Sequence, residues 1–409
     1  MKHEQLLTDV FKAYYDARKH KRNTTSQLKF EVNMEDNLVK LAHDIESRQY
    51  EVERSICFIV TKPVKREVFA ADFRDRVMHH LLYNYLSPLL ERTFIHDCYS
   101  CRKGFGTLYG INRVAGNIRK CTQNFTRPAY VLKLDISGYF MSMNRKILLN
   151  KLVQILDKYA RRRCGKEQLR WSEYLDYDLI KYLLEKVVLS NPTDGCIIRG
   201  NRKEWDGLPR NKSLFYAKKD CGLPIGNLTS QLFSNVYLTD FDHCMKRERH
   251  IRYYGRYVDD IIMIDNDRQR LKELMKETED KMKASFGLQL HPKKRYLQHM
   301  SKGFEFLGMK QRRTVLVPGK RMKHNMTDII GEYVKMTDTD IDYSQVKQYR
   351  SRINSYVGLL HHCASRRLCN DIRKRLYGAP NAYLLMNGPM TKTVINSRDI
   401  VDTICHTYG

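Results

Sequence analysis

The sequence predicts an α+β fold in which an antiparallel sheet is backed by helices. An apolar run on each side of Tyr257-Val258-Asp259-Asp260 indicates a buried pair of strands joined by a tight turn, which we call the acidic turn. The run from Tyr130 to Asp135 alternates as strands do and is apolar enough to be buried. Stretches with helical periodicity precede and follow these strands, so the sheet is expected to pack against helices.

Helical periodicity of apolar side chains marks most of the remaining chain. The helical regions are residues 1–60, 75–90, 148–184, 271–286 and the stretch after about 325. Asn33 is an expected helix start, and Arg161-Arg162-Arg163 divides region 148–184 into two helices. The Gly- and charge-rich residues 192–222 read as an extended insertion. Tyr349, Ile353, Val357 and Leu360 share one helical face, which predicts a small C-terminal lobe.

The composition points to a polyanionic partner. The chain has 409 residues, enough for two or three lobes, and a formal net charge of +27. A charge excess of this size opposes compaction and favours nucleic acid, although a merely soluble basic surface is the plain alternative. Because no segment approaches the ~20 apolar residues that span a bilayer, no membrane partner is expected. Eleven cysteines with irregular spacing suggest reduced thiols in a cytoplasm.

Two adjacent carboxylates at the tip of a buried hairpin call for a cation. Asp259 and Asp260 repel each other beside buried strands, and a hard divalent ion such as Mg²⁺ prefers oxygen ligands of this kind. Asp135 ends the other predicted strand. If the two strands are neighbours, these three residues, the aspartate trio, can hold two Mg²⁺ ions about 3.5–4 Å apart, with Mn²⁺ as a substitute. Taken alone, Asp135 could simply cap a turn at a strand end.

The order of these elements resembles a reverse transcriptase. Asp135 with Phe140 is similar to the family's first palm motif, and the acidic turn is similar to its Y-x-D-D box. Between them lies Gly222-Leu223-Pro224-Ile225-Gly226-Asn227-Leu228-Thr229-Ser230-Gln231, which is similar to the template-contacting palm motif. Lys294 lies in a segment that resembles the fourth motif, and Phe304-Glu305-Phe306-Leu307-Gly308 resembles the primer-grip hairpin. The resemblance covers roughly residues 55–310.

The resemblance implies a right-hand polymerase with fingers, palm and thumb. It places the N-terminal helical region and fingers at 1–125, the palm at 126–310 with an insertion at about 160–220, and a basic helical thumb with the tail at 311–409. It implies an RNA-directed DNA polymerase, a nucleotidyltransferase that binds an RNA template, an RNA/DNA heteroduplex and dNTPs. The fold could also be retained in a catalytically silent nucleic-acid-binding scaffold.

The resemblance also assigns roles to individual residues. Asp135, Asp259, Asp260 and Lys294 would be catalytic, with the Ile136 carbonyl as an additional metal ligand. The expected dNTP-binding residues are Lys65, Arg66, Arg102, Phe140, Gly226 and Gln231. The expected template and primer contacts are Ser230, Gln231, Tyr257, Phe306, Leu307 and Gly308. Simpler interpretations are a core aromatic for Phe140, surface charges for Arg66 and Arg102, and a solvated lysine pair for Lys293 and Lys294.

One departure from the common palm motif points to a particular subgroup of reverse transcriptases. Where the palm motif commonly reads S-P, this chain has Ser230-Gln231, and the string from Ile225 to Gln231 resembles reverse transcriptases of diversity-generating retroelements. That resemblance implies a bacterial or phage enzyme that copies a template-repeat RNA with errors at adenines (mutagenic retrohoming). It also implies a small accessory protein that forms a basic oligomer. An intron-type or phage-defence reverse transcriptase without a mutagenic role is the alternative.

Overall fold

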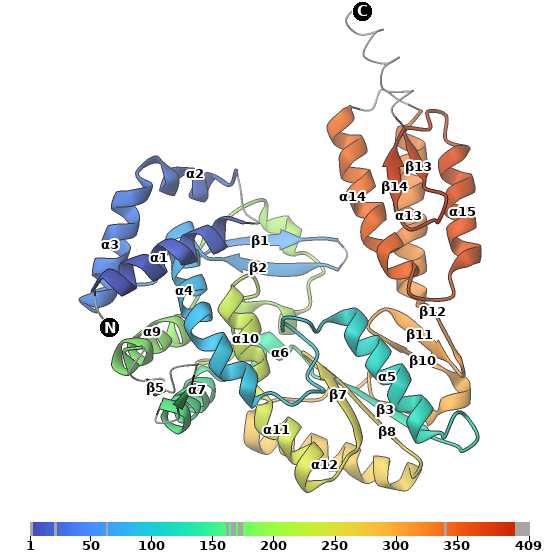
Figure 1. Cartoon of the computed structure of the whole chain (residues 1–409), viewed down its shortest axis with the longest axis horizontal. Helices are drawn as coiled ribbons and strands as arrows, with labels where there is room; N and C mark the ends of the chain where they lie inside the picture. Colours follow the sequence, from blue (N-terminus) through green and yellow to red (C-terminus); the bar gives the residue numbers. More distant parts are fainter. Residues whose placement is uncertain are drawn as a thin grey trace, which may run out of the picture. The chain divides into compact units, whose positions relative to one another are not determined.

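The structure of the chain is a computed structural model that describes residues 3–19, 23–62, 64–160, 163–164, 169–170, 175–338 and 342–396. The chain forms two compact units (Figure 1). Unit 1 comprises residues 1–106, 132–263 and 269–296, and unit 2 comprises 107–131, 264–268 and 297–409. These units do not divide the chain at residues 125 and 310, so the assignment of fingers, palm and thumb boundaries remains a prediction.

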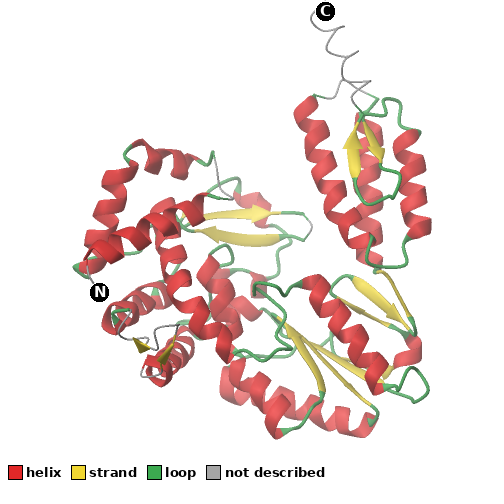
Figure 2. Cartoon of the chain, in the orientation of Figure 1, coloured by secondary structure: helices red, strands yellow, loops and turns green. Residues whose placement is uncertain are grey.

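The helices of unit 1 lie largely where apolar periodicity predicts them (Figure 2). They are α1 (His3–Arg18), α2 (Thr25–Val32), α3 (Met34–Glu46), α4 (Phe73–Leu90), α6 (Tyr139–Ser142), α7 (Arg145–Ala160), α9 (Tyr177–Leu189), α10 (Leu228–Tyr237), α11 (Thr239–His243) and α12 (Arg268–Phe286). Helix α3 follows Asn33 and buries Leu38, Leu41 and Ile45, which confirms the predicted start. Asp72 caps α4 by accepting a hydrogen bond from the Arg74 amide.

The basic stretch Arg18-Lys19-His20-Lys21-Arg22 and the predicted basic break at 161–163 are only partly described. Arg18 pairs with Glu31 at 2.6 Å and Lys19 with Asp16 at 2.7 Å, whereas His20, Lys21 and Arg22 lie outside the described residues. Arg161 and Arg162 also lie outside them. Between α7 and α9, the strands β4 (Arg163–Cys164) and β5 (Leu169–Arg170) form a short antiparallel hairpin.

The sheet that carries the acidic turn has four strands in the order β7-β8-β3-β9. They are β7 (Tyr253–Tyr257), β8 (Asp260–Asp265), β3 (Tyr130–Asp135) and β9 (Tyr296–His299). Because only two residues connect β7 and β8, these strands are antiparallel neighbours. The position of β3 beside β8 meets the condition set for the predicted two-ion site, that the strands of Asp135 and of the acidic turn are neighbours.

The insertion 192–222 is attached to a smaller sheet in unit 1, to which it contributes one strand. Strand β1 (Ile56–Val60) pairs antiparallel with β2 (Arg66–Ala70) and parallel with β6 (Ile197–Ile198). The insertion continues through three single-turn 3₁₀ helices, η2 (Arg202–Trp205), η3 (Arg210–Lys212) and η4 (Leu214–Tyr216). The buried carboxylate of Glu67 on β2 accepts hydrogen bonds from the Trp205 indole, the Ser213 hydroxyl and the Leu214 amide at 2.6–2.7 Å.

Unit 2 combines a helical core with small sheets. It contains α5 (Thr107–Cys121), the antiparallel strands β10 (Phe304–Phe306), β11 (Met309–Arg312) and β12 (Val315–Pro318), the helices α13 (Lys320–Met336), α14 (Tyr343–Leu360) and α15 (Arg366–Tyr377), and the pair β13 (Leu384–Met386) and β14 (Thr393–Ile395). Tyr349, Ile353, Val357 and Leu360 belong to one buried cluster, which confirms the predicted helical face. The strands β13 and β14 were not predicted.

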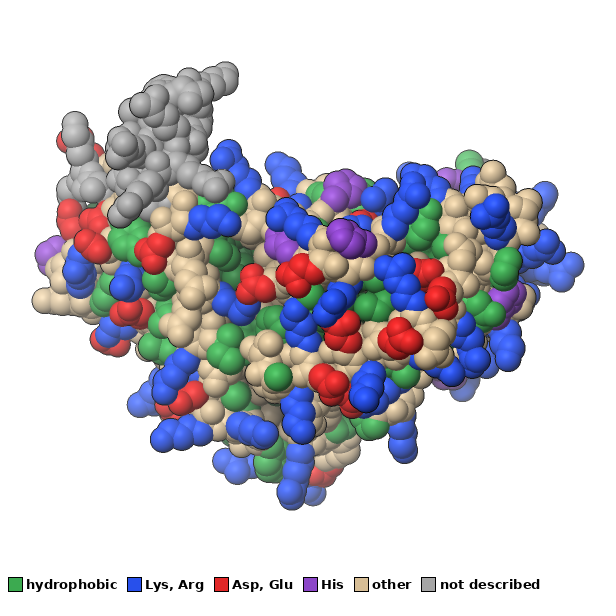
Figure 3. Space-filling model, turned by 90° about the horizontal axis from the view of Figure 1, so that it is seen from below, with side chains coloured by type: hydrophobic (Ala, Val, Ile, Leu, Met, Phe, Trp, Pro, Cys, Tyr) green, Lys and Arg blue, Asp and Glu red, His purple; other side chains and the backbone are tan. Residues whose placement is uncertain are grey.

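The basic excess is visible on the surface of the described residues. Lys and Arg side chains are distributed over the face drawn in Figure 3 rather than gathered in one patch. Among the described residues, no helix is both long and apolar enough to cross a membrane.

Candidate active site

The acidic turn has a strained backbone that its neighbours hold in place. Val258 has a φ of +55°, a left-handed conformation that β-branched residues rarely adopt. Its amide donates a hydrogen bond of 3.1 Å to the Ser100 hydroxyl, and its carbonyl accepts one of 3.1 Å from Arg256 Nη1. These two contacts hold the peptide groups on either side of Val258, the residue that precedes Asp259.

Arg256 is fully buried and connects the turn to the helices behind it. Its Nε and Nη2 atoms donate to the two carboxylate oxygens of Asp242, at 2.8 and 2.6 Å. Nη2 also donates to the Asn235 carbonyl at 3.2 Å, and the Tyr254 hydroxyl donates to Asp242. Although burial opposes a charge, the nearby Asp242 carboxylate holds the pKa of Arg256 well above its usual value. Sequence reasoning did not single out this network.

The end of β3 meets the acidic turn directly. The Ile136 amide donates a hydrogen bond of 3.3 Å to the Asp259 carbonyl. Burial, followed by the charges of Asp260 and Asp135, raises the pKa of Asp259 to about 7. Burial also raises the pKa of Asp260, against the opposing effect of Lys133. The aspartate trio therefore shares one partly desolvated site in which the three negative charges interact.

Two lysines reach the trio. Lys294 Nζ lies 2.8 Å from Asp135 Oδ2, and Lys133 Nζ lies 3.3 Å from Asp260 Oδ1. Lys294 was predicted at the site, whereas Lys133 was missed. Lys133 precedes Asp135 by two residues on β3, so both side chains point to the same face of the sheet, and this spacing was the available signal.

The donor set of the site fits a hard divalent cation. Within the described ranges, no three His, Cys, Asp or Glu side chains already stand in a preformed metal-binding arrangement. Two of the trio's carboxylates are instead engaged by lysine ammonium groups, and the third, Asp259, resists ionisation. Three carboxylates held this close repel one another, and a bound divalent cation would offset that repulsion. Hard ions such as Mg²⁺ or Mn²⁺ prefer carboxylate oxygens.

The residues predicted to bind the nucleotide occupy different settings in unit 1. Arg66 is exposed at the start of β2, while Lys65 Nζ donates to the Asp206 carbonyl at 2.7 Å. Phe140 is half-buried and packs against the cluster that contains Phe69. Arg102 is held inside its loop: Nη1 donates to the Ile95 and Cys98 carbonyls at 2.9 and 3.0 Å, and the guanidinium lies 4.1 Å from the Phe105 ring centroid. Their roles toward a dNTP remain predictions.

Contacts within the protein explain why position 226 of the template-contacting motif is a glycine. Gly226 has a φ of +136°, and a Cβ there would lie 2.8 Å from the Phe69 carbonyl oxygen. The adjacent Ile225 carbonyl accepts a hydrogen bond of 2.9 Å from the Phe69 amide. The glycine thus allows the loop to approach β2, and its expected contact with a dNTP remains a prediction.

Helix α10 begins earlier than predicted. Its N-cap is Asn227 and its first residue is Leu228. Ser230, a residue type that often begins helices and that we expected to begin this one, lies inside the first turn, so that expectation was wrong. Asn227 has the extended backbone of an N-cap, and its side chain accepts a hydrogen bond of 3.1 Å from the Ala71 amide, which anchors it. Ser230 is buried, Gln231 is exposed, and Tyr257 in the acidic turn is half-buried.

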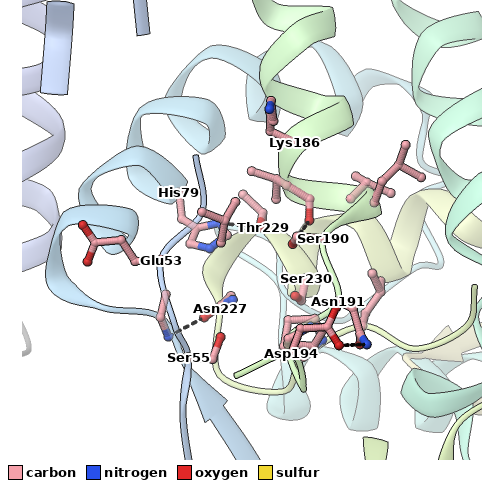
Figure 4. A pocket seen from close by; sticks show the side chains of 18 of the residues that line it. Glu53, Ser55, His79, Lys186, Ser190, Asn191, Asp194, Asn227, Thr229 and Ser230 are labelled. Carbon is pink, nitrogen blue, oxygen red and sulfur yellow. Dashed lines mark hydrogen bonds between the residues drawn. The ribbon is translucent and has the colours of Figure 1, made fainter. Parts of the chain in front are cut away.

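Ser230 faces a cavity of about 500 Å³ in unit 1 (Figure 4). His79, Asn227 and Thr229 line the same cavity, and the His79 ring accepts or donates a hydrogen bond of 2.8 Å with the Thr229 hydroxyl. Helix α9 and the residues after it, including Lys186, Ser190 and Asn191, also line the cavity. None of the aspartate trio lines this cavity.

The predicted primer-grip residues form a tight hairpin in unit 2. Phe306 pairs with Met309 across β10 and β11, and Leu307 and Gly308 make the two-residue connection. Both connecting residues have positive φ, +50° and +83°, as type I′ hairpin turns require.

Comparison with known proteins identifies the domain that carries this site. Residues 65–311 match the family model of the reverse transcriptase (RNA-dependent DNA polymerase). The chain belongs to the reverse transcriptase family. The match includes the aspartate trio, Lys294 and the β10–β11 hairpin, and it agrees with the α+β right-hand polymerase fold expected from the sequence.

Individual relatives of this reverse transcriptase are distant. The chain is 22% identical to Protein YkfC of Escherichia coli (strain K12), over 58% of this chain and 60% of that protein. A telomerase structure from Candida albicans is 13% identical over 86% of this chain and 62% of that chain, with a TM-score of 0.44. A structure of apo telomerase from Candida Tropicalis is 12% identical over 80% of this chain and 60% of that chain, with a TM-score of 0.46. The chain therefore spans about 60% of the length of these relatives.

Proposed function

We propose that the chain is an RNA-directed DNA polymerase that adds deoxynucleoside monophosphates to a 3′ hydroxyl and releases pyrophosphate. The observation that carries this proposal is the aspartate trio, which converges from two adjacent strands inside the matched reverse transcriptase domain. Charge repulsion within the trio is unfavourable unless cations bind there, and nucleotidyl transfer uses cations at such a site.

In this proposal Asp135, Asp259 and Asp260 would hold two Mg²⁺ ions, with the Ile136 carbonyl as an additional ligand and Mn²⁺ as a substitute. Bound ions would lower the pKa of the 3′ hydroxyl and offset the charge of the departing pyrophosphate. Lys294 is the protein's candidate proton donor, since its ammonium group already lies beside Asp135. Lys133 would stay near Asp260 and limit the net negative charge of the site.

The remaining site residues would position the substrates. Phe140 would exclude a 2′ hydroxyl, Lys65, Arg66 and Arg102 would bind the triphosphate, and Gly226 with Gln231 would contact the nucleotide and the templating base. Ser230, Tyr257 and the hairpin residues Phe306, Leu307 and Gly308 would contact template and primer. The exposure of Arg66 and Gln231 leaves both side chains available for such contacts.

Primer extension tests the proposal. The purified chain should extend a DNA primer on an RNA template when Mg²⁺ and dNTPs are present, and an Asp259→Asn, Asp260→Asn variant should not. Asp280→Asn, which removes an exposed carboxylate on α12, is the control and should keep full activity. Extension by the double variant would overturn the proposal, and a wild type that binds RNA without extending a primer would be a silent scaffold.

We further propose that the enzyme copies a template-repeat RNA with errors at template adenines. The support is the string from Ile225 to Gln231, together with the exposed position of Gln231 in the first turn of α10. A side chain there can alter how the templating base is held, and a looser fit lowers discrimination. Sequencing cDNA made on a defined template tests this. Equal error rates at all four bases would leave an intron-type or phage-defence reverse transcriptase.

The same proposal includes a small accessory protein that forms a basic oligomer, in a bacterial or phage-encoded cytoplasmic system. The nine cysteines described with their side chains are all free thiols, as a reducing compartment favours. A basic oligomer would repel a chain of charge +27, so we expect RNA to link the two. Ribonuclease treatment should therefore dissociate the complex, and a complex that persists without RNA would contradict this arrangement.

A further inference from the structure

A short stretch of the insertion carries cations and exposed rings together. The segment 210–219, which we call the basic–aromatic segment, contains four Lys or Arg residues and no Asp or Glu. All four cations, Arg210, Lys212, Lys218 and Lys219, are exposed. Phe215 and Tyr216 between them are 43% and 62% exposed. A solvated basic face explains the cations but not two large rings in water.

Buried residues in the middle of the basic–aromatic segment anchor it to the protein. Ser213 and Leu214 are buried, and both are bound by the Glu67 carboxylate. On the outer side, the Arg210 guanidinium lies 5.2 Å from the centroid of the Tyr216 ring. The buried anchors leave Tyr216 and the ammonium groups on the outer side, while the Phe215 ring lies 5.6 Å from the ring of the buried Phe69. The surface is therefore ordered before any ligand binds.

The same segment touches the backbone that follows Asp135. The Asn211 side chain donates a hydrogen bond of 3.0 Å to the Ser137 hydroxyl. At Gly138 an added Cβ would lie only 2.4 Å from the Asn211 carbonyl oxygen, so the two backbones are in close contact. The basic–aromatic segment therefore lies in unit 1 next to the turn that positions Asp135.

We propose that the basic–aromatic segment binds the single-stranded part of the RNA template, with its lysines on phosphates and Tyr216 stacked on a base. The inference rests on the proposed polymerase function. A strand of unpaired nucleotides presents phosphates and base faces in alternation, which matches a surface of cations interleaved with rings. A dNTP triphosphate would use the cations but not the rings. A duplex would not use the rings either, because its bases are already stacked.

Two sets of variants test this binding surface. The first is Lys212→Gln, Lys218→Gln, Lys219→Gln, matched by Lys272→Gln, Lys276→Gln, Lys283→Gln, which removes three exposed lysines of α12. The second is Tyr216→Ala, matched by Tyr15→Ala, whose ring is 56% exposed on α1. Dissociation constants are measured in Mg²⁺-free buffer for a fluorescent primer–template with a ten-nucleotide RNA overhang and for the blunt-ended duplex.

We expect the lysine variant to weaken binding of the overhang substrate and to lower the slope of log Kd against log salt by about 2, the value for three phosphates of a single strand. Tyr216→Ala should weaken the same binding by about tenfold. Binding of the blunt duplex and both control variants should be unchanged. Equal effects on both substrates, or unchanged binding of the overhang substrate by either variant, would overturn the proposal. Because the assay needs no catalysis, an enzyme that binds the overhang but extends no primer would refute only the polymerase proposal.

Discussion

The guanidinium of Arg256 and the carboxylate of Asp242 form a fully buried two-point ion pair, and the same guanidinium supports the carbonyl of Val258 in the acidic turn. The pair thus joins helix α11 to the strained residue that precedes Asp259. A buried pair is a weak source of net stability, because its desolvation offsets its attraction. Its value here lies in fixing the turn.

Removing one partner of this pair should be far more damaging than removing both. Asp242→Leu leaves a buried unpaired guanidinium and should lower the free energy of unfolding by about 3–5 kcal/mol. The double variant Arg256→Met, Asp242→Leu should regain most of that stability in urea unfolding, but primer extension should stay low because Val258 has lost its support. The exposed pair Arg249–Glu277 is the control, and its replacement should change stability by less than about 1 kcal/mol. Full activity in the double variant would show that Arg256 does not position the turn.

The sequence predicted the parts of the site that depend on local pattern. Strand alternation before Asp135 and around Asp259 was enough to predict the strands themselves. That they are neighbours was only a condition of the two-ion site, and the observed order β8-β3 meets it. Arg256 could not be recognised, because a buried cation is stable only with partners, and its partners Asp242 and Asn235 come from elsewhere in the chain. In the sequence alone, Arg256 is one of many basic residues.

Packing between distant segments explains the other omissions. Gly226 looked like a ligand-contacting glycine, yet the Phe69 carbonyl is what excludes a side chain there. Glu67 follows the predicted dNTP-binding residues Lys65 and Arg66 and was given no role, but its buried carboxylate is the acceptor that holds the insertion. In both cases the partner lies more than a hundred residues away, so no local period or motif reveals the contact.

Neutralising Asp259 should separate stability from activity. The pKa of Asp259 is raised to about 7 in the folded protein, so at pH 8 its carboxyl is ionised although the fold disfavours that charge. Without metal, this charge lowers the stability of the wild type. Asp259→Asn removes that charge and should raise the free energy of unfolding by about 1–4 kcal/mol while abolishing primer extension. Mg²⁺ should then raise the Tm of the wild type but not of Asp259→Asn. Asp280→Asn should leave the Tm and its Mg²⁺ dependence unchanged, and a lower Tm for metal-free Asp259→Asn would contradict the interpretation.

His79 should make the fold sensitive to mild acid. Burial lowers its pKa from 6.5 to about 3, so the unfolded chain binds a proton below pH 6.5 that the folded chain does not. Its contribution to stability is present above pH 6.5 and is lost as the pH falls, by about 2 kcal/mol at pH 5. Asp75, whose pKa burial raises to about 6, acts in the opposite sense, so the His79 contribution is measured by difference. Unfolding of wild type and His79→Gln at pH 7.5 and 5 should show a smaller loss in the variant. His324→Gln, at an exposed site, should behave as wild type.

Glu67 should control whether the insertion stays docked. Its carboxylate is the common acceptor for the Trp205 indole, the Ser213 hydroxyl and the Leu214 amide, and Glu67→Gln would turn an NH₂ group toward some of these donors. We expect a loss of about 2 kcal/mol or more in the free energy of unfolding, because buried donors lose a charged partner. Limited digestion with trypsin should then cut after Arg210 or Lys212 faster than in the wild type. The exposed Glu35→Gln is the matched control. Unchanged digestion of Glu67→Gln would mean that the other contacts of the insertion, among them the apolar packing of Leu214 and the Asn211–Ser137 hydrogen bond, are sufficient to hold it.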